Sequence, residues 1–256
     1  MRRLVLVSTL SLCTSAFAAS PEEQKVLDAY LLGSADAAKE AAVVKLLDAK
    51  PALARSQEVL VMGLDQSSVE GDLGARGKKL AELALARGAD PNGKDKDGNP
   101  LLIKYGMFAR VAPMGILLAA KGANPDAADQ DNRTALHWLA TMGEQDKEQR
   151  LIDQVKAAAT LLLDKKANVN AKDKRGKTPL HISAHNGAKQ LSELLLARGA
   201  DMNAVDNDGY SVLGAALLRV EERKGEPSFA NDKEKAATRA VIEVLKKKGA
   251  KDVRPK

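Results

Sequence analysis

The chain has 256 residues, one cysteine, 3% aromatic residues and a formal net charge of +6. The chain is long enough to form one elongated domain or one and a half compact ones. Its single cysteine, Cys13, excludes an internal disulfide and any site of several thiolates. The scarcity of aromatics argues against nucleic acid as a partner, because nucleic-acid sites combine basic residues with stacking rings.

Residues 1–18 have the pattern of a secretory signal peptide. Arg2 and Arg3 precede an apolar run too short to span a bilayer, and residues 16–18 (Ala-Phe-Ala) form a small-x-small cleavage pattern. We expect cleavage after Ala18 and a bacterial protein in the periplasm, or secreted from it. A lipoprotein signal at Cys13 is the alternative, which the large preceding leucine disfavours. No later apolar run is long enough to predict a membrane span.

Residues 19–71 carry a weak helical pattern. Ser20 and Glu23 are spaced as the cap and the third residue of a helix, with Pro21 at the first helical position. Residues 43–49 resemble a degenerate second helix that Pro51 ends. We predict degenerate helical repeats here, which cap one end of a stack and run on into a repeat domain over 72–256.

A short phrase recurs through that domain, each time after a Leu-rich stretch. Its copies begin at Gly88, Gly122, Lys166, Gly199 and Gly249, and each continues with alanine and usually Asp or Asn. A period of roughly 33 residues, lengthened twice, is typical of a stacked repeat protein.

The clearest copy runs from Asp173 to residue 201. Gly176 suits the positive φ of a tight turn, Thr178 suits a helix cap, and Pro179 suits the first helical position. A Leu-rich second helix over 188–198 then ends at a glycine.

The order turn, Thr178-Pro179-Leu180-His181, helix, Asn-Gly, Leu-rich helix and Gly-Ala-Asp resembles the ankyrin repeat. Similar copies begin at Asp95, Asp129 and Asp206. The resemblance implies an all-α solenoid of about six helix-turn-helix units with short β-turn or hairpin connections. It also implies a monomeric, non-catalytic module that binds another protein with its turns and first helices. His181 would then tie neighbouring turns together by hydrogen bonds.

Two units are longer than the repeat. The extra residues fall near 143–153 and near 219–236, in both cases between the two helices of a pair. Their polarity suits solvated loops or helix extensions, and they could equally serve recognition, since long loops in compact folds often do.

We find no chemical site in the sequence. His181 and His185 have a spacing that could hold a metal, but no glutamate follows His181 as a metalloprotease helix requires. The Asp-rich turns lack the first ligand and the later Glu of an EF-hand loop. Nothing resembles an activated nucleophile or a cofactor motif, so we predict no enzyme, no metal and no cofactor.

Comparison of the four turns separates scaffold from contact positions. The residue three before the turn centre is always Asp, which indicates a side chain that bonds its own turn backbone. The positions two before, one before and one after vary, as contact positions should; they are Lys96, Asp97, Asn99, Gln130, Asp131, Arg133, Lys174, Arg175, Lys177, Asn207, Asp208 and Tyr210. First-helix candidates are Met107, Phe108, Met142 and His185.

The large apolar candidates could anchor a partner or could fill gaps in irregular repeats. Trp138, one residue after a repeat histidine, we assign to the core.

These features favour a periplasmic scaffold or inhibitor that binds another protein. An immunity protein against a secreted toxin, an accessory factor in envelope or oxidative stress, and a host-directed effector remain open. A histidine-based metal carrier or enzyme is the alternative from a different class.

Overall fold

The computed structural model describes residues 19–33, 36–144, 147–221 and 231–255. It divides into two compact units, Met1–Asp90 and Pro91–Lys256. The predicted signal peptide lies outside the described residues, as do parts of both predicted insertions. Within the described ranges, no helix is both long enough and apolar enough to cross a membrane.

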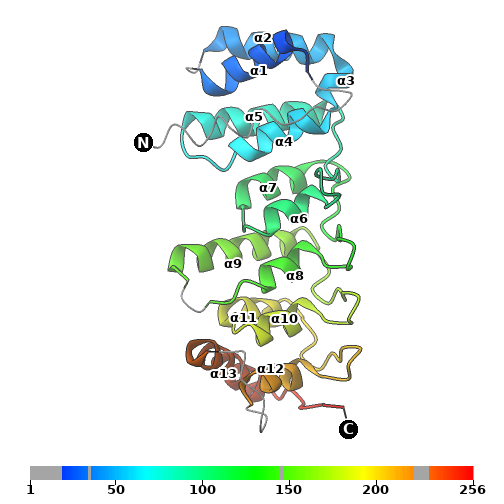
Figure 1. The fold of residues 1–256 in the computed structure, drawn as a ribbon, viewed down its shortest axis with the longest axis vertical. Helices are drawn as coiled ribbons and strands as arrows, with labels where there is room; N and C mark the ends of the chain where they lie inside the picture. Colours follow the sequence, from blue (N-terminus) through cyan, green and yellow to red (C-terminus); the bar gives the residue numbers. More distant parts are fainter. Residues whose placement is uncertain (1–18, 34–35, 145–146, 222–230, 256) are drawn as a thin grey trace. The chain divides into compact units, whose positions relative to one another are not determined.

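The described part of the first unit is helical throughout (Figure 1). Its helices are α1 (Pro21–Leu32), α2 (Ala37–Ala49), α3 (Pro51–Ala54), α4 (Gln57–Gln66) and α5 (Asp72–Ala86). Ser20 and Glu23 form the expected reciprocal cap of α1. Helix α4 packs along α5, and α1 packs against both α2 and α5. The predicted boundary at residue 72 falls between α4 and α5, so α5 belongs here to the unit of the N-terminal helices.

The second unit repeats one arrangement four times (Figure 1). Its helices are α6 (Leu101–Gly106), α7 (Val111–Ala119), α8 (Ala135–Ala140), α9 (Gln149–Asp164), α10 (Pro179–His185), α11 (Lys189–Ala197), α12 (Val212–Val220) and α13 (Asp232–Lys247). The first helices of successive pairs pack on one another in chain order, and so do the second helices, which gives two layers. The predicted all-helical stack of helix-turn-helix units is confirmed.

Local sequence explains where these helices start. Before α10, the Thr178 hydroxyl accepts a hydrogen bond from the backbone N–H of His181, and Pro179 occupies the first turn, where its missing N–H costs nothing. Leu180, Leu191 and Leu195 of this pair are buried almost completely. An apolar stripe on each helix therefore supplies the core between the two layers.

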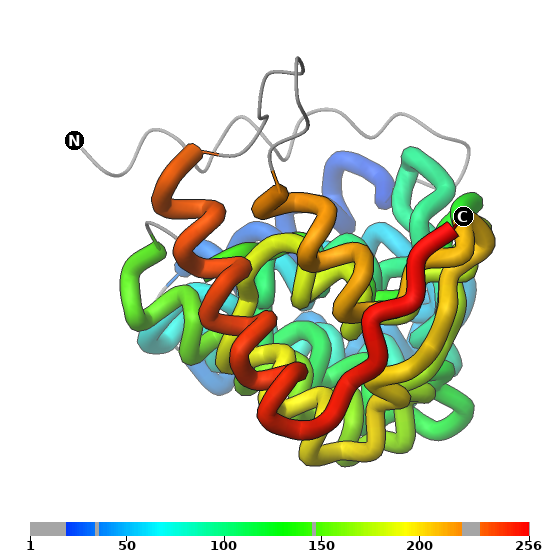
Figure 2. Tube along the Cα trace, turned by 90° about the horizontal axis from the view of Figure 1, so that it is seen from below, coloured from blue at the N-terminus to red at the C-terminus, as the bar shows by residue number. Residues whose placement is uncertain are grey.

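Hairpin-like turns connect the pairs of the second unit. Isolated antiparallel bridges join Lys94 to Pro100, Ala128 to Thr134 and Val205 to Ser211. Figure 2 shows the last residues of the chain running beside the final turn. There the backbone N–H of Ser211 donates to the carbonyl of Val253 at 2.9 Å, and the Ser211 hydroxyl donates to the carbonyl of Lys251 at 2.7 Å. Residues 251–253 thus satisfy the polar groups of Ser211.

The described parts of both insertions lengthen second helices. Helices α9 and α13 have 16 residues each, against 9 in α7 and α11. Asn231 and Glu234 form a reciprocal cap that starts α13. The described parts of the insertions are therefore helix extensions, and a role in recognition stays a prediction.

Candidate functional site

Each of the four turns in the second unit is built around one aspartate. The Oδ1 atoms of Asp95, Asp129, Asp173 and Asp206 each accept backbone N–H groups from the residues two and four positions later, at 2.8–3.1 Å. The predicted role of this invariant residue is therefore confirmed. Because each carboxylate accepts the N–H groups of its own turn, it holds the turn backbone in one conformation.

Backbone hydrogen bonds connect one turn to the next. The N–H of Lys174 donates to the carbonyl of Asp131, and the N–H of Asn207 donates to the carbonyl of Arg175, both at 2.9 Å. The Asn207 side chain also donates to the carbonyl of Lys174 at 3.0 Å. Asn207, a predicted contact residue, thus contributes its side-chain amide to the scaffold. The left-handed Gly176 lies under this amide, and a Cβ there would stand 2.4 Å from its oxygen.

Two repeat histidines tie the first helices to the following turns. His137 Nε2 lies 3.1 Å from the carbonyl of Lys177, and His181 Nε2 lies 3.3 Å from the carbonyl of Tyr210. The backbone N–H of Thr178 donates to His181 Nδ1, so Nδ1 is unprotonated and Nε2 carries the hydrogen that it donates. Burial lowers the pKa of both imidazoles. The predicted structural role of His181 is confirmed.

His185 is used inside the stack. Its Nε2 accepts a hydrogen bond from Arg219 Nη1 at 3.2 Å, and Nη2 of the same arginine pairs with Glu234 at 3.3 Å. Burial, and then the charge of Arg219, lower the His185 pKa. The imidazole therefore joins α10 to α12 and α13. In the described ranges, no group of three or more His, Cys, Asp or Glu side chains is placed to hold a metal ion.

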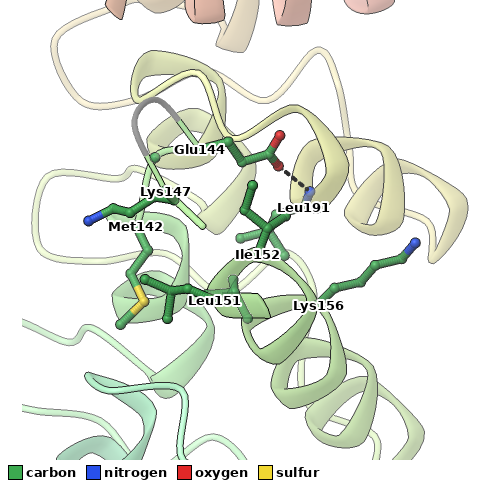
Figure 3. Close-up of a pocket in the computed structure, with 9 residues that line it drawn as sticks. Met142, Glu144, Lys147, Leu151, Ile152, Lys156 and Leu191 are labelled. Carbon is green, nitrogen blue, oxygen red and sulfur yellow. Dashed lines mark hydrogen bonds between the residues drawn. The ribbon is translucent and has the colours of Figure 1, made fainter. Parts of the chain in front are cut away.

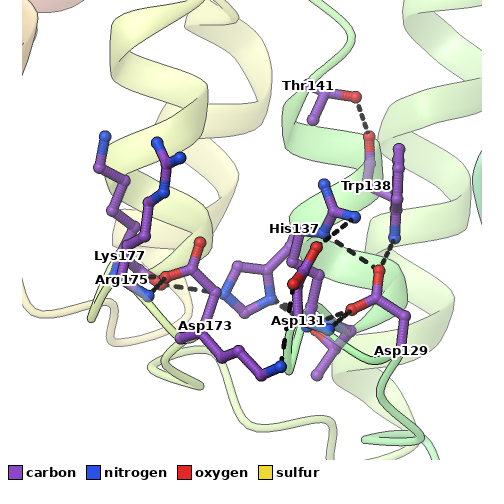
Figure 4. A network of polar contacts seen from close by, with 11 residues as sticks. Asp129, Asp131, His137, Trp138, Thr141, Asp173, Arg175 and Lys177 are labelled. Atoms are coloured by element: carbon purple, nitrogen blue, oxygen red, sulfur yellow. Dashed lines mark hydrogen bonds and ion pairs between the residues drawn. The ribbon is translucent and has the colours of Figure 1, made fainter.

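Trp138 lies at the surface, and its assignment to the core is wrong. Leu136, Leu139 and Ala140 form the buried side of α8, which turns position 138 outward and leaves the indole half-buried. The Trp138 Nε1 donates to Asp129 Oδ2 at 3.0 Å. The guanidinium of Arg133 lies 4.2 Å from the ring centroid, in cation–π contact. Figure 4 shows this indole beside the turn that carries Asp129.

The other predicted contact residues divide by exposure. Side chains in the two positions before each turn centre are exposed: Lys96, Asp97, Gln130, Asp131, Lys174, Arg175, Asn207 and Asp208. Those one position after it are half-buried: Asn99, Arg133, Lys177 and Tyr210. The two outer positions are therefore exposed in all four turns, as contact positions must be.

The apolar candidates behave differently from one another. Phe108 is 63% exposed, with the Arg110 guanidinium 5.9 Å from its ring centroid, so it is available as an anchor. Met107 is half-buried. Met142 is also half-buried and lines a small pocket with Leu151 (Figure 3), which favours the gap-filling alternative for this methionine.

Comparison with known proteins agrees with this geometry. Residues 153–222 match the family model of ankyrin repeats in three copies, and residues 131–174 match the single ankyrin repeat. Residues 131–222 therefore match ankyrin repeats. Proteins built from such repeats bind other proteins and are in general non-enzymatic.

Several relatives share these ankyrin repeats. An ankyrin repeat protein of fowlpox virus, FPV244, is 44% identical over 59 residues, which is 23% of this chain and 9% of that protein. Human Rabankyrin-5 is 28% identical over 179 residues, or 61% of this chain and 14% of its own length. A second fowlpox protein, FPV230, is 35% identical over 77 residues, or 30% and 39%.

The chain therefore spans well under half of each of these relatives. They come from a poxvirus and from human, so they give no support to the predicted bacterial origin or to export.

An unpredicted contact joins two ankyrin repeats on the side of the second helices. Glu144 Oε1 accepts the backbone N–H of Gln190 at 2.6 Å and that of Leu191 at 3.4 Å (Figure 3). Helix α11 has no side-chain cap of its own, so Glu144 caps it from the preceding repeat. Burial raises the Glu144 pKa. The insertion thus ties neighbouring repeats together.

Alignment of the copies contained a signal for the surface position of Trp138. The residue after each repeat histidine, or its equivalent, is Lys104, Trp138, Ile182 or Ala215. This position varies as strongly as the turn positions, and three of its four residues are partly exposed. Comparing equivalent positions of the first helices, as was done for the turns, therefore identifies position 138 as a candidate contact position.

Proposed function

We propose that this chain is a periplasmic, non-catalytic module that binds another protein through the turns and first helices of its second unit, as a scaffold or an inhibitor. The observation that carries the proposal is the exposed row of non-repeating side chains on a repeating frame. Its turn aspartates and histidines recur, whereas residues such as Lys96, Gln130 and Lys174 differ from copy to copy.

The frame suits recognition for a physical reason. Carboxylates and inter-turn hydrogen bonds already fix the turn backbone, so a partner need order little beyond the side chains it meets. A specific complex of ordinary size would bury about 1,600 Å² in total, which calls for contacts on several repeats. Phe108 at one end and the turn residues along the edge supply such spread contacts.

Export rests on the sequence pattern of residues 1–18 and requires its own test. The full chain, expressed in a bacterium with a C-terminal tag, should be recovered in the periplasmic fraction, and N-terminal sequencing should begin at Ala19. Recovery of uncleaved protein in the cytoplasm would refute the periplasmic assignment without touching the binding face.

The binding face is tested by capture from periplasmic extract. Wild-type protein should retain a partner that the triple variant Lys96→Ala, Gln130→Ala, Lys174→Ala loses. Stability should change by less than about 0.5 kcal/mol, because these are exposed substitutions. A control variant with the same change in charge in α9 and directly after it, Gln154→Ala, Lys156→Ala, Lys165→Ala, should retain the partner. Equal capture by both variants would refute the turn face, and no capture by wild type would refute the module.

A further inference from the structure

The turn at residues 172–177 differs from the other turns in charge. Lys172, Lys174, Arg175 and Lys177 are cationic, and the one carboxylate among them, Asp173, accepts the backbone N–H groups of Arg175 and Lys177. The equivalent turn of the next repeat has Asn207, Asp208 and Tyr210 at the variable positions. The positive charge therefore belongs to one copy and does not follow from the repeat architecture.

Two of the four cations make contacts with described residues, and two do not. Lys172 donates to the carbonyl of Val205 at 3.3 Å, and Lys174 lies 4.0 Å from Asp131. The side chains of Arg175 and Lys177 make no hydrogen bond or ion pair with any described residue. Both extend in the same direction from the turn in Figure 4.

The helix that bonds to this turn also carries a partly exposed aromatic ring, Trp138. His137, the residue before Trp138, forms a hydrogen bond with the carbonyl of Lys177. This bond joins α8 to the cationic turn. The indole is held by Asp129 at its Nε1 edge and by the guanidinium of Arg133. A ring held in one orientation loses little conformational entropy when a partner covers it.

We propose that this cationic turn and Trp138 together bind an acidic segment of a partner protein. The inference rests on the proposed function and specifies the partner's chemistry. Carboxylates of the segment pair with Arg175 and Lys177, the arginine through two parallel N–H groups, and an adjacent apolar side chain packs on the exposed part of Trp138. A partner that covers these cations removes their water of hydration, which costs free energy unless the partner supplies negative charges. Acidic sequences are therefore favoured.

Nucleic acid fits this surface less well. Single strands bind by stacking successive bases on several aromatic side chains, and aromatic residues make up only 3% of this chain.

Trp138 is the only tryptophan of the chain, so its fluorescence reports on this site alone. The purified full chain is titrated with a short peptide in which several glutamates flank one leucine. We expect a saturable change in Trp138 emission that weakens as salt is added. In the double variant Arg175→Glu, Lys177→Glu the apparent affinity should fall roughly tenfold or more. The matched variant Lys121→Glu, Lys156→Glu has the same net charge and should bind like wild type.

Three results would overturn the proposal. One is unchanged Trp138 emission with the acidic peptide, and another is equal weakening in both double variants. The third is a tighter response to a single-stranded oligonucleotide or to anionic phospholipid vesicles than to the peptide. If the proposed module is correct but this inference fails, wild-type protein still captures its partner and Arg175→Glu, Lys177→Glu captures it equally well. If the module itself is wrong, no variant captures anything.

Discussion

The two units hold their helix pairs together by different means. In the first unit, α4 and α5 approach closely because Gly63 and Gly77 carry no side chains. A Cβ at Gly63 would lie 2.5 Å from the backbone N of Ala81 and 2.8 Å from the carbonyl O of Gly77. Ion pairs such as Arg87 with Asp48 at 2.6 Å lie at the surface of this unit. Close glycine packing is therefore what brings α4 against α5, and the second unit has a close glycine contact of its own where Gly187 meets Ala237.

In the second unit the corresponding feature is a polar ladder. Aspartates such as Asp173 close each turn, and His137 and His181 bond α8 and α10 to the turns that follow them. This difference shows that the helix-pair architecture does not depend on the recurring motif. The motif specifies turns that present side chains, and helix packing alone is sufficient where no such turn is needed.

The largest expected effect comes from filling the glycine contact. Gly63→Ala should destabilise the first unit by about 2–3 kcal/mol, because the added methyl group meets backbone atoms that cannot rotate away. Hydrogen exchange resolved by peptide should show the loss of protection in α4 and α5.

Gly115→Ala in α7 is the matched control for that substitution. A Cβ at Gly115 would have its nearest neighbour at 3.8 Å, an ordinary contact, so the variant should be neutral or more stable by about 0.5–1 kcal/mol through helix propensity. Similar destabilisation by both substitutions would refute steric fit between α4 and α5 as the cause of the effect at Gly63.

A smaller effect is expected from opening one turn of the ladder. Asp173→Ala removes the acceptor of two backbone N–H groups and should cost about 2 kcal/mol, at roughly 1 kcal/mol for each hydrogen bond. Denaturant unfolding followed by Trp138 fluorescence measures the change in the second unit.

The chain supplies two controls for this turn. Asp173→Asn keeps an oxygen in place of Oδ1 and should recover much of the loss, whereas Asp208→Ala removes an exposed carboxylate and should change stability by less than about 0.5 kcal/mol. Equal losses for Asp173→Ala and Asp208→Ala would show that charge, and not turn hydrogen bonding, determines the effect.

Local features of the sequence predicted local features of the structure. The turn aspartates, the cap at Thr178 and the left-handed Gly176 depend on residues within a few positions, and all are present. The bonding role of His181 came from the family resemblance, which carries information about neighbouring repeats that the local sequence lacks.

Contacts between distant segments were not predictable in this way. Glu144 caps a helix that begins 45 residues later along the chain, and Gly63 matters only because α5 packs on α4. Trp138 is a second example: its position after a repeat histidine predicts a core residue, but the packing of α8 turns the indole partly outward. Such positions depend on packing between elements, which residue type alone does not specify.

The smallest expected effect is that of acidification, which should lower the stability of the second unit and leave that of the first unit unchanged. All three histidines, His137, His181 and His185, lie in the second unit, and burial is the main cause that lowers each pKa. The unfolded chain therefore binds more protons than the folded one once the pH falls below the ordinary histidine pKa of about 6.5. Stability is fully present above that pKa and decreases as the pH falls toward the lowered folded values.

Denaturant unfolding between about pH 8 and pH 5.5, followed by Trp138 fluorescence, should show this decrease while most carboxylates stay ionised. Protection of α4 and α5 from hydrogen exchange, corrected for the intrinsic rate, should stay constant because the first unit has no histidine.

Glu144 acts with the opposite sign, because its pKa is raised and its protonation favours the folded state. Glu144→Gln should therefore make the loss of stability on acidification steeper. His185→Gln should make it shallower by removing one titrating group. Constant stability of the second unit over this range, or an equal loss in both units, would contradict the assignment of the pH response to the histidines.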